Sequence, residues 1–208
     1  MRIEVPEEHH ATHPFASLKD FVFHILTISL GLGLALAGEG AVEHYNHRAL
    51  ANETREYFRT QLEDNRKAVA THQKATAEMQ AALLKAVVLL DTDFAGAKKV
   101  LIDAPHEFLD LNTGSWDPAV ATGALNYMPL REVQAYSQIH VSELSLNRLN
   151  RENEDVWFDG SEYNAQTAEL DKNDLESLKK ILRKAAMYSK RIGLQEQELM
   201  KMYDQAEK

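Results

Sequence analysis

Residues 21–48, FVFHILTISLGLGLALAGEGAVEHYNHR, decide the architecture of this chain. From Phe21 to Gly38 run 18 residues without a formal charge. As an α-helix this stretch is about 27 Å long, close to the roughly 30 Å hydrocarbon core of a bilayer. It shows no polar stripe between Ile25 and Gly38, unlike most helices of soluble proteins. We therefore expect a transmembrane anchor at residues 21–42, preceded by an N-terminal tail, residues 1–20.

A cleaved signal peptide is the alternative to this anchor. Ala35-Leu36-Ala37 matches the small-x-small cleavage pattern, and Leu26–Leu34 has the length of an apolar signal core. The leader before it is acidic, whereas a signal peptide begins with a basic segment. We therefore expect an uncleaved anchor.

Small residues recur at every fourth position of the span. Ser29, Gly33 and Ala37 form one row, and Gly31 and Ala35 form a second. Such rows let two helix backbones approach closely in a membrane, although small residues are also common in spans that pair with nothing. The rows favour, besides lipid contact, a second packed helix from a copy of this chain or from another membrane-protein subunit.

The segment after the span has a heptad pattern on a predicted helix of some 40 residues, from Arg48 to about Leu90, continuous with the span. One set of positions is Arg55, Leu62, Val69, Thr76, Leu83 and Leu90, and the other is Phe58, Asn65, His72, Met79 and Ala86. Asn65 and His72 either specify the register of this seam or are ordinary bundle positions whose polar groups find hydrogen-bond partners within the bundle.

Capping signals predict the later helices. Asp91 or Asp93 caps a short helix that ends near Asp103, and Asp117-Pro118 and Met128-Pro129 begin two more. The second of these runs from Leu130 to about Val156 before a turn at residues 159–164. Its expected apolar face is Val133, Ser137, Val141 and Leu144. Asp171 or Asn173 caps a last long helix, whose apolar line is Leu175, Leu178, Ile181 or Leu182, Ala185, Ile192, Leu199 and Met202.

No convincing strand pattern is present, so the predicted fold class is all-α. The N-terminal transmembrane helix continues into an antiparallel helical bundle, residues 43–208. Within the bundle, residues 91–128 are expected to form a distal or lateral cap of short helices and loops.

Two segments together carry a resemblance. LTISLGLGLALAGEGAVEHYNHR, residues 26–48, followed by WDPAVATGALNYMPLREVQAYS, residues 116–137, resembles a family of bacterial single-span proteins that has no known activity. Its members have a Leu- and Gly-rich span, then a helical domain with a W-D-x-A…G-A-L-x-Y-x-P segment. The resemblance covers about a third of the chain. It implies an anchored helical domain and brings no catalytic residues.

The compartment is predicted from the same features. Arg2 and Lys19 precede the span, and Arg48, Arg55 and Arg59 follow it, so the positive-inside rule leaves the orientation open. A short tail before an N-terminal anchor more often stays inside. We therefore expect a single-pass protein of the bacterial inner membrane with a periplasmic domain.

Composition narrows the function classes. The net charge is −9, and residues 103–162 hold 11 acidic residues against 3 basic ones, so nucleic-acid binding is not expected. The chain has no cysteine, which removes thiolate chemistry and Cys-ligated zinc. No phosphate-binding glycine loop or G-x-S-x-G elbow is present. We expect no cofactor and no catalysis.

Two groups of residues remain as candidate sites. Glu43, His44 and His47 have the spacing of a metal site on one helix face, but the same residues suit a membrane interface, and we expect no metal. Trp116, Tyr127, Tyr136 and Trp157 fall in the acidic region. They form either a ligand or partner surface or structural contacts of the bundle.

The sequence therefore favours a membrane-anchored helical interaction protein. It would act as an accessory or scaffolding subunit of a membrane complex, or by self-association. The alternative is a sensor-like, ligand-binding bundle that relays a signal to a partner.

Overall fold

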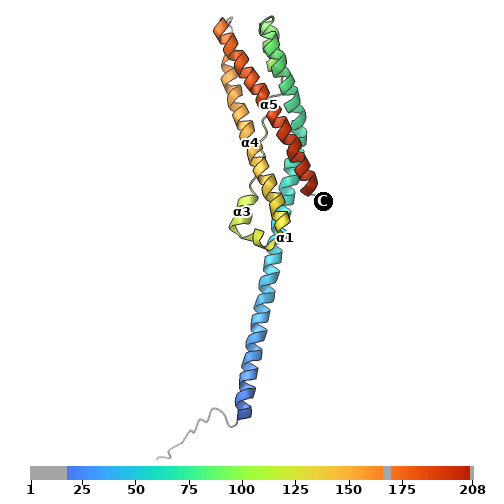
Figure 1. The fold of residues 1–208 in the computed structure, drawn as a ribbon, viewed down its shortest axis with the longest axis vertical. Coiled ribbons are helices and arrows are strands. Elements are labelled where there is room, and N and C mark those ends of the chain that lie inside the picture. Colours follow the sequence, from blue (N-terminus) through green and yellow to red (C-terminus); the bar gives the residue numbers. More distant parts are fainter. Residues whose placement is uncertain (1–17, 166–169, 207–208) are drawn as a thin grey trace, which may run out of the picture. The chain divides into compact units, whose positions relative to one another are not determined.

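The computed structural model describes residues 18–165 and 170–206, with the backbone alone for residues 161–165. All regular elements in these ranges are helical, which confirms the all-α fold class (Figure 1). The chain divides into two compact units, Met1–Ala49 and Leu50–Lys208. The elements are α1 (Leu18–Leu89), α2 (Phe94–Ile102), α3 (Trp116–Ala121), the 3₁₀ helix η1 (Ala124–Tyr127), α4 (Leu130–Ala165) and α5 (Lys172–Ala206).

Helix α1 contains a segment long and apolar enough to cross a membrane. An 18-residue window near its N-terminus has a mean hydropathy of 2.0, and none of the window is buried. Between Glu43 and Leu89 the sequence has no proline or glycine, so nothing breaks the hydrogen-bonding pattern of the helix. The apolar segment and the first bundle helix are therefore one element, as the sequence predicted.

The second predicted set, from Phe58 to Ala86, is buried throughout, whereas the first set is buried only from Val69 onward. Both Asn65 and Val69 are buried, each four residues after the previous buried position. Two successive four-residue steps shift the seam around the helix, a local stutter in the heptad pattern. On the N-terminal side the buried residues are therefore Gln61 and Thr54, one position before the predicted Leu62 and Arg55.

Caps and breaks define the shorter elements. The Asp93 carboxylate accepts a 2.8 Å bond from the Gly96 N–H and caps α2. Asp171 Oδ1 accepts bonds from two N–H groups at the start of α5, at 2.7 and 2.8 Å. Both caps were predicted. Helix α3 instead begins one residue before the expected N-cap, and Gly123, with φ of 70°, follows its C-terminus.

The turn expected at residues 159–164 does not form, because α4 continues through it to Ala165. Gly160 is buried inside this helix, and a Cβ atom there would lie 3.4 Å from Ile181 Cγ2 of α5. The glycine thus permits close packing of α4 on α5 instead of ending α4. These two helices pack as an antiparallel hairpin (Figure 1).

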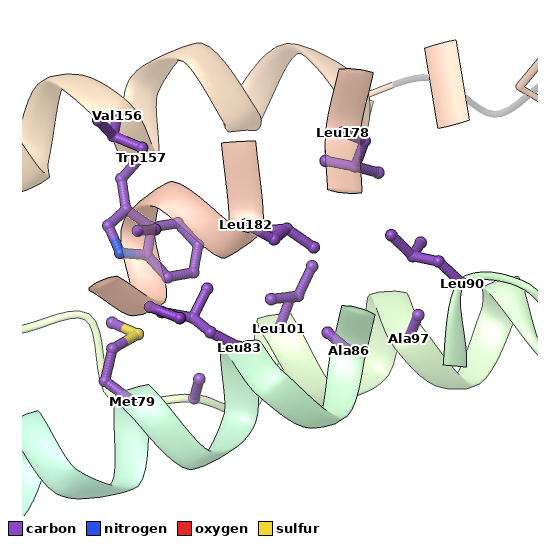
Figure 2. Close-up of a cluster of buried hydrophobic side chains, with 13 residues drawn as sticks. Met79, Leu83, Ala86, Leu90, Ala97, Leu101, Val156, Trp157, Leu178 and Leu182 are labelled. Atoms are coloured by element: carbon purple, nitrogen blue, oxygen red, sulfur yellow. The ribbon is translucent and has the colours of Figure 1, made fainter. Parts of the chain in front are cut away.

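The core of the second unit consists of three clusters. The largest combines α1, α2, α4 and α5, with Leu83, Leu101, Trp157 and Leu182 among its members (Figure 2). A second surrounds Val69, Leu146 and Leu199. The third packs Ala51 and Phe58 of α1 against α3 and Met128.

Residues 91–128 lie along the side of the bundle, the lateral of the two predicted placements, rather than at one end. Helix α2 packs beside Leu83 and Ala86, whereas α3 packs beside Ala51 and Phe58. Between them residues 103–115 form no helix, and we call this segment the strap. Successive hydrogen bonds join it to His72, then Asn65, then Gln61, so it runs antiparallel to α1 along the bundle.

The expected face of α4 is wrong, since Val141 and Leu144 are 61% and 44% exposed. Besides Gly160, the buried residues of α4 are instead Ile139, Glu143, Leu146, Asn147, Leu149, Asn150, Asn153, Val156 and Trp157. The predicted line of α5 is largely confirmed, with Leu182 buried rather than Ile181 and Tyr203 rather than Met202. Two polar residues, Ser189 and Glu196, belong to the same buried line.

Candidate functional site

Side-chain amides hold the strap in the bundle. Asn147 of α4 binds both main-chain groups of Leu111: its Oδ1 accepts from the N–H at 2.7 Å, and its Nδ2 donates to the carbonyl at 2.8 Å. Asn65 of α1 binds both main-chain groups of Asn112 in the same way, at 3.0 and 2.7 Å. The Ser115 N–H donates to Gln61 Oε1 at 2.9 Å. These bonds replace the secondary structure that would otherwise satisfy a buried main chain.

A buried carboxyl lies behind these amides. The side chain of Glu143 is fully buried, and its Oε1 accepts hydrogen bonds from Asn65 Nδ2 and Tyr203 Oη, both at 2.8 Å. Gln61 Nε2 donates to the other oxygen at 3.4 Å. Burial raises the pKa of the Glu143 carboxyl, although the hydrogen bonds from these three neutral groups oppose the rise. Burial, together with this carboxyl, also raises the pKa of the Tyr203 hydroxyl far above its ordinary value.

A second buried polar group joins α1, α5 and the strap. His72 Nδ1 lies 2.6 Å from Glu196 Oε1, and His72 Nε2 lies 2.9 Å from the main-chain oxygen of Glu107. Thr76 Oγ1 lies 3.0 Å from the same Nδ1. Burial lowers the pKa of His72, but the hydrogen bonds to Glu196 and to the Glu107 carbonyl outweigh it, and the pKa is raised overall.

An open groove lies against the first of these buried clusters. Its volume is about 870 Å³, and residues of α1, α4 and α5 line it. We call it the α1/α5 groove; its lining residues are Arg55, Glu56, Arg59, Leu62, Glu63, Arg66, Lys67, Ala70, Tyr136, Met200, Tyr203 and Ala206. Because Tyr203 lines the groove and also donates to Glu143, the groove is connected to the buried carboxyl.

The four cationic side chains of the groove each have an acidic neighbour. Two pairs link different helices: Arg55 with Glu132 of α4 at 2.7 Å, and Arg66 with Asp204 of α5 at 2.6 Å. Arg59 and Lys67 pair within α1, at 3.6 and 2.7 Å. The Arg59 side chain is 77% exposed, so it can exchange its partner at little cost.

The predicted seam residues do not share one environment. Asn65, Val69, His72, Met79 and Leu83 are buried in the bundle, whereas Leu62 is half-buried and lines the α1/α5 groove. Asn65 and His72 contact the strap rather than a second heptad helix. Within this chain they are therefore satisfied bundle positions, one of the two interpretations that the pattern left open.

The predicted span residues Ser29, Gly31, Gly33, Ala35 and Ala37 all lie exposed on α1. A Cβ atom added at Gly31 or Gly33 would meet no atom within 4 Å. Both rows are thus open, either to lipid or to another helix.

The four aromatic residues do not form one surface. The Phe58 ring lies between two of them, with its centroid 4.5 Å from Tyr136 and 6.0 Å from Trp116. Trp157 belongs instead to the largest core cluster, where its ring meets the edge of His106. Tyr127 is 43% exposed. Only Tyr136 lines the α1/α5 groove, so the hypothesis of a single aromatic surface is wrong.

The candidate metal residues are not brought together. His47 Nε2 lies 3.8 Å from Glu43 Oε1, and His44 is exposed beside them. No three His, Asp or Glu side chains within residues 18–165 and 170–206 are arranged to hold an ion.

Sequence reasoning missed Glu143, Asn147, Glu196 and Tyr203. A signal was present, because α4 carries Ile139, Glu143, Leu146, Asn150, Asn153 and Trp157 at alternating steps of four and three residues. That spacing describes a heptad seam with three polar members. The same alternation on α5 includes Ser189, Glu196 and Tyr203.

Comparisons with protein-family models, with curated proteins and with solved structures find no match for this chain.

Proposed function

We propose that this chain is a membrane-anchored helical protein that acts by binding, and that its α1/α5 groove receives a helical segment of a partner. In this role it is an accessory or scaffolding subunit of a membrane complex, or it associates with copies of itself. The observation that carries the proposal is the groove of about 870 Å³, one wall of which belongs to the helix that holds the apolar segment. No catalytic step is part of the proposal.

The proposed location is the inner membrane of a bacterium, with a single span and the bundle in the periplasm. The apolar window of α1, with a mean hydropathy of 2.0, supports anchoring. The resemblance supports the bacterial origin, and the side of the membrane is part of the proposal. Membrane lipid is then the first contact of residues 21–42.

The groove suits an amphipathic helix that carries carboxylates. Its α1 wall runs from Arg55 to Ala70, about 22 Å at 1.5 Å per residue, or four turns of a bound helix. Leu62 and Met200 supply apolar contact between the cationic side chains. The exposed Arg59–Glu56 pair contributes only about 0–1 kcal/mol, so a carboxylate of the partner can replace Glu56.

Photo-crosslinking in native membranes tests the proposal. A crosslinking amino acid replaces Arg59 in the groove and, as a matched control, Lys190, which is exposed on α5 outside the groove. We expect specific adducts at residue 59 only, and their loss when Arg55 and Arg66 are replaced by glutamate. Adducts with other proteins would identify an accessory subunit, and adducts between copies would identify self-association. A monomeric particle in mild detergent with no adduct at residue 59 would refute the proposal.

A sensor-like, ligand-binding bundle is the second candidate function. The supporting observation is a continuous series of bonds from the groove to the strap: Tyr203 donates to Glu143, which also binds Asn65, and Asn65 holds Asn112. A small ligand in contact with Tyr203 would perturb this series. A thermal-shift screen with small carboxylates tests it: we expect a rise in Tm that the Tyr203→Phe variant lacks.

A further inference from the structure

The ring of His72 is held between two acceptors that belong to different elements. Glu196 Oε1 of α5 faces Nδ1 at 2.6 Å, and the Glu107 carbonyl of the strap faces Nε2 at 2.9 Å. A carbonyl oxygen and an ionised carboxylate only accept hydrogen bonds, and a neutral imidazole has a single N–H to donate. Both contacts therefore form together only when the ring carries its second proton.

We propose that His72 is a proton-operated clamp: the imidazolium ties the strap to α1 and α5, and loss of its proton releases the strap at Glu107. This device goes beyond the proposed binding function and does not depend on it.

The strap is released, rather than α5, because losing the hydrogen bond between His72 and the Glu107 carbonyl costs less free energy than losing the one between His72 and Glu196. The Glu196 side chain is fully buried, and its Oε2 has no partner among the described residues. Without the Nδ1–H of His72, a buried carboxylate would lose its main donor. Glu107 is exposed, so water can bind its carbonyl once the strap moves away. The neutral ring therefore keeps its proton on Nδ1, and its Nε2 lone pair repels the Glu107 oxygen.

The groups around His72 come from every element packed against it. On α1, the Thr76 hydroxyl lies 3.0 Å from Nδ1 and 3.3 Å from Glu196 Oε1. Helix α5 contributes the Glu196 carboxylate and the Ser189 hydroxyl, and the strap contributes Glu107, which acts through its carbonyl and its charge. Helix α4 contributes the uncharged Asn150 and Asn153 beside a cavity of about 10 Å³.

One cation is also nearby. Lys67 lines the same shallow depression as His72, but its side chain is 67% exposed and pairs with Glu63 at 2.7 Å. Two carboxylates thus oppose the burial of the ring and raise the pKa of His72 above its ordinary value. The release consequently falls above pH 6.5, the ordinary pKa of a histidine side chain.

The release is confined to one part of the strap. Asn147 holds Leu111 and Asn65 holds Asn112 through amide groups that do not titrate. Opening therefore extends from Pro105 to about Asp110, since Ala104 stays packed in the largest core cluster and residues 111–115 remain fixed. It uncovers the half-buried Phe108 and Leu109, which line the depression beside His72.

Distance measurements between two spin labels test the clamp on the full chain in detergent micelles. The chain has no native cysteine, so His106→Cys on the strap and Lys190→Cys on α5 are unique labelling sites. The first substitution also removes the histidine nearest to the clamp on the strap. We expect a narrow distance distribution at pH 5.5 and a broad, longer one at pH 9, with the midpoint above 6.5. A distribution that does not change over this range would overturn the proposal.

Two further substitutions in the labelled chain assign the transition to its residues. His72→Gln removes the titrating ring, so the distribution should no longer change with pH; a transition that persists would overturn the proposal. Glu196→Gln removes the charge that holds the proton, and burial then dominates, so the midpoint should fall by about one pH unit or more. A midpoint that stays in place would also overturn it, even where His72→Gln fails to fold.

Discussion

The amide of Asn147 is the clearest test of how the strap is held, because one side chain satisfies both main-chain groups of Leu111. Asn147 and Leu111 are 4% exposed each, so water does not replace the lost bonds without opening the structure. Asn147→Leu, close in volume, would leave one buried N–H and one buried carbonyl unpaired. Each such group costs about 1–3 kcal/mol, so we expect a destabilisation of roughly 2–6 kcal/mol. That is a large part of the 5–15 kcal/mol typical of a folded domain.

The assay is urea unfolding of the full chain in mild detergent, followed by circular dichroism. Asn126→Leu is the control, because Asn126 is an exposed asparagine outside the core, and it should change the free energy of unfolding by no more than about 0.5 kcal/mol. Asn147→Asp keeps the acceptor for the Leu111 N–H but loses the donor to its carbonyl, and should be destabilising as well. If Asn147→Leu costs less than about 1 kcal/mol, the Asn147 amide does not hold the strap.

Four further substitutions, one of them a surface control, test the packing and the buried charge of the bundle. Leu83→Ala should cost about 3–5 kcal/mol because Leu83 is fully buried, whereas Leu84→Ala, at 51% exposed, should cost under 1 kcal/mol in the same urea assay. Glu143→Gln should flatten the pH dependence of stability. The pKa of Glu143 is raised in the folded state, so its stabilising contribution is complete below pH 4.5 and is lost as the pH rises through the folded-state pKa. Between pH 4.5 and 8 the variant should therefore become more stable relative to the parent. The gain is about 1.4 kcal/mol for each pH unit by which the folded-state pKa exceeds the unfolded-state pKa. Parallel pH profiles of stability for the two proteins would contradict this. Gly193→Ala should stabilise α5 by about 0.5–1 kcal/mol, since the new methyl would lie 3.6 Å from Thr76 Cγ2, in ordinary van der Waals contact without a clash; a loss in Tm would contradict it.

The parts of the fold that depend on local chemistry were predictable. The uncharged run in residues 21–38 predicted an apolar helix, and the absence of proline and glycine after Glu43 predicted that α1 continues into the bundle. Asp93 and Asp171 predicted the starts of α2 and α5, because a carboxylate cap acts within its own turn. Most of the α1 seam followed from its heptads, because the heptad period fixes which helix face is buried until the stutter between Gln61 and Val69 shifts it.

The candidate site was only partly predictable. Asn65 and His72 were identified as polar members of the seam, and Leu62 and Tyr136 were named among the candidates and do line the groove. Their partners Glu143, Glu196 and Tyr203 were missed, because a glutamate is counted as a surface residue unless its hydrogen-bond donors are known. The heptad spacing of α4 and α5 includes these three residues, but it does not identify their hydrogen-bond partners, which lie 60 or more residues away in the chain.

The sequence by itself determined most of the helices, the caps of α2 and α5 and the apolar segment of α1, because each depends on residues within a few positions of one another. Only the tertiary structure decided which face of α4 is buried. An apolar count selects Val141 and Leu144, but the helix turns Glu143, Asn147 and Asn150 inward. The hydrogen-bond partners make this possible: Asn147 binds the main chain of the strap, Glu143 accepts from Asn65 and Tyr203, and Asn150 donates to the Leu146 carbonyl of its own helix. Burial of a polar group is favourable only where its partner is already in place, and that is a property of the folded chain as a whole.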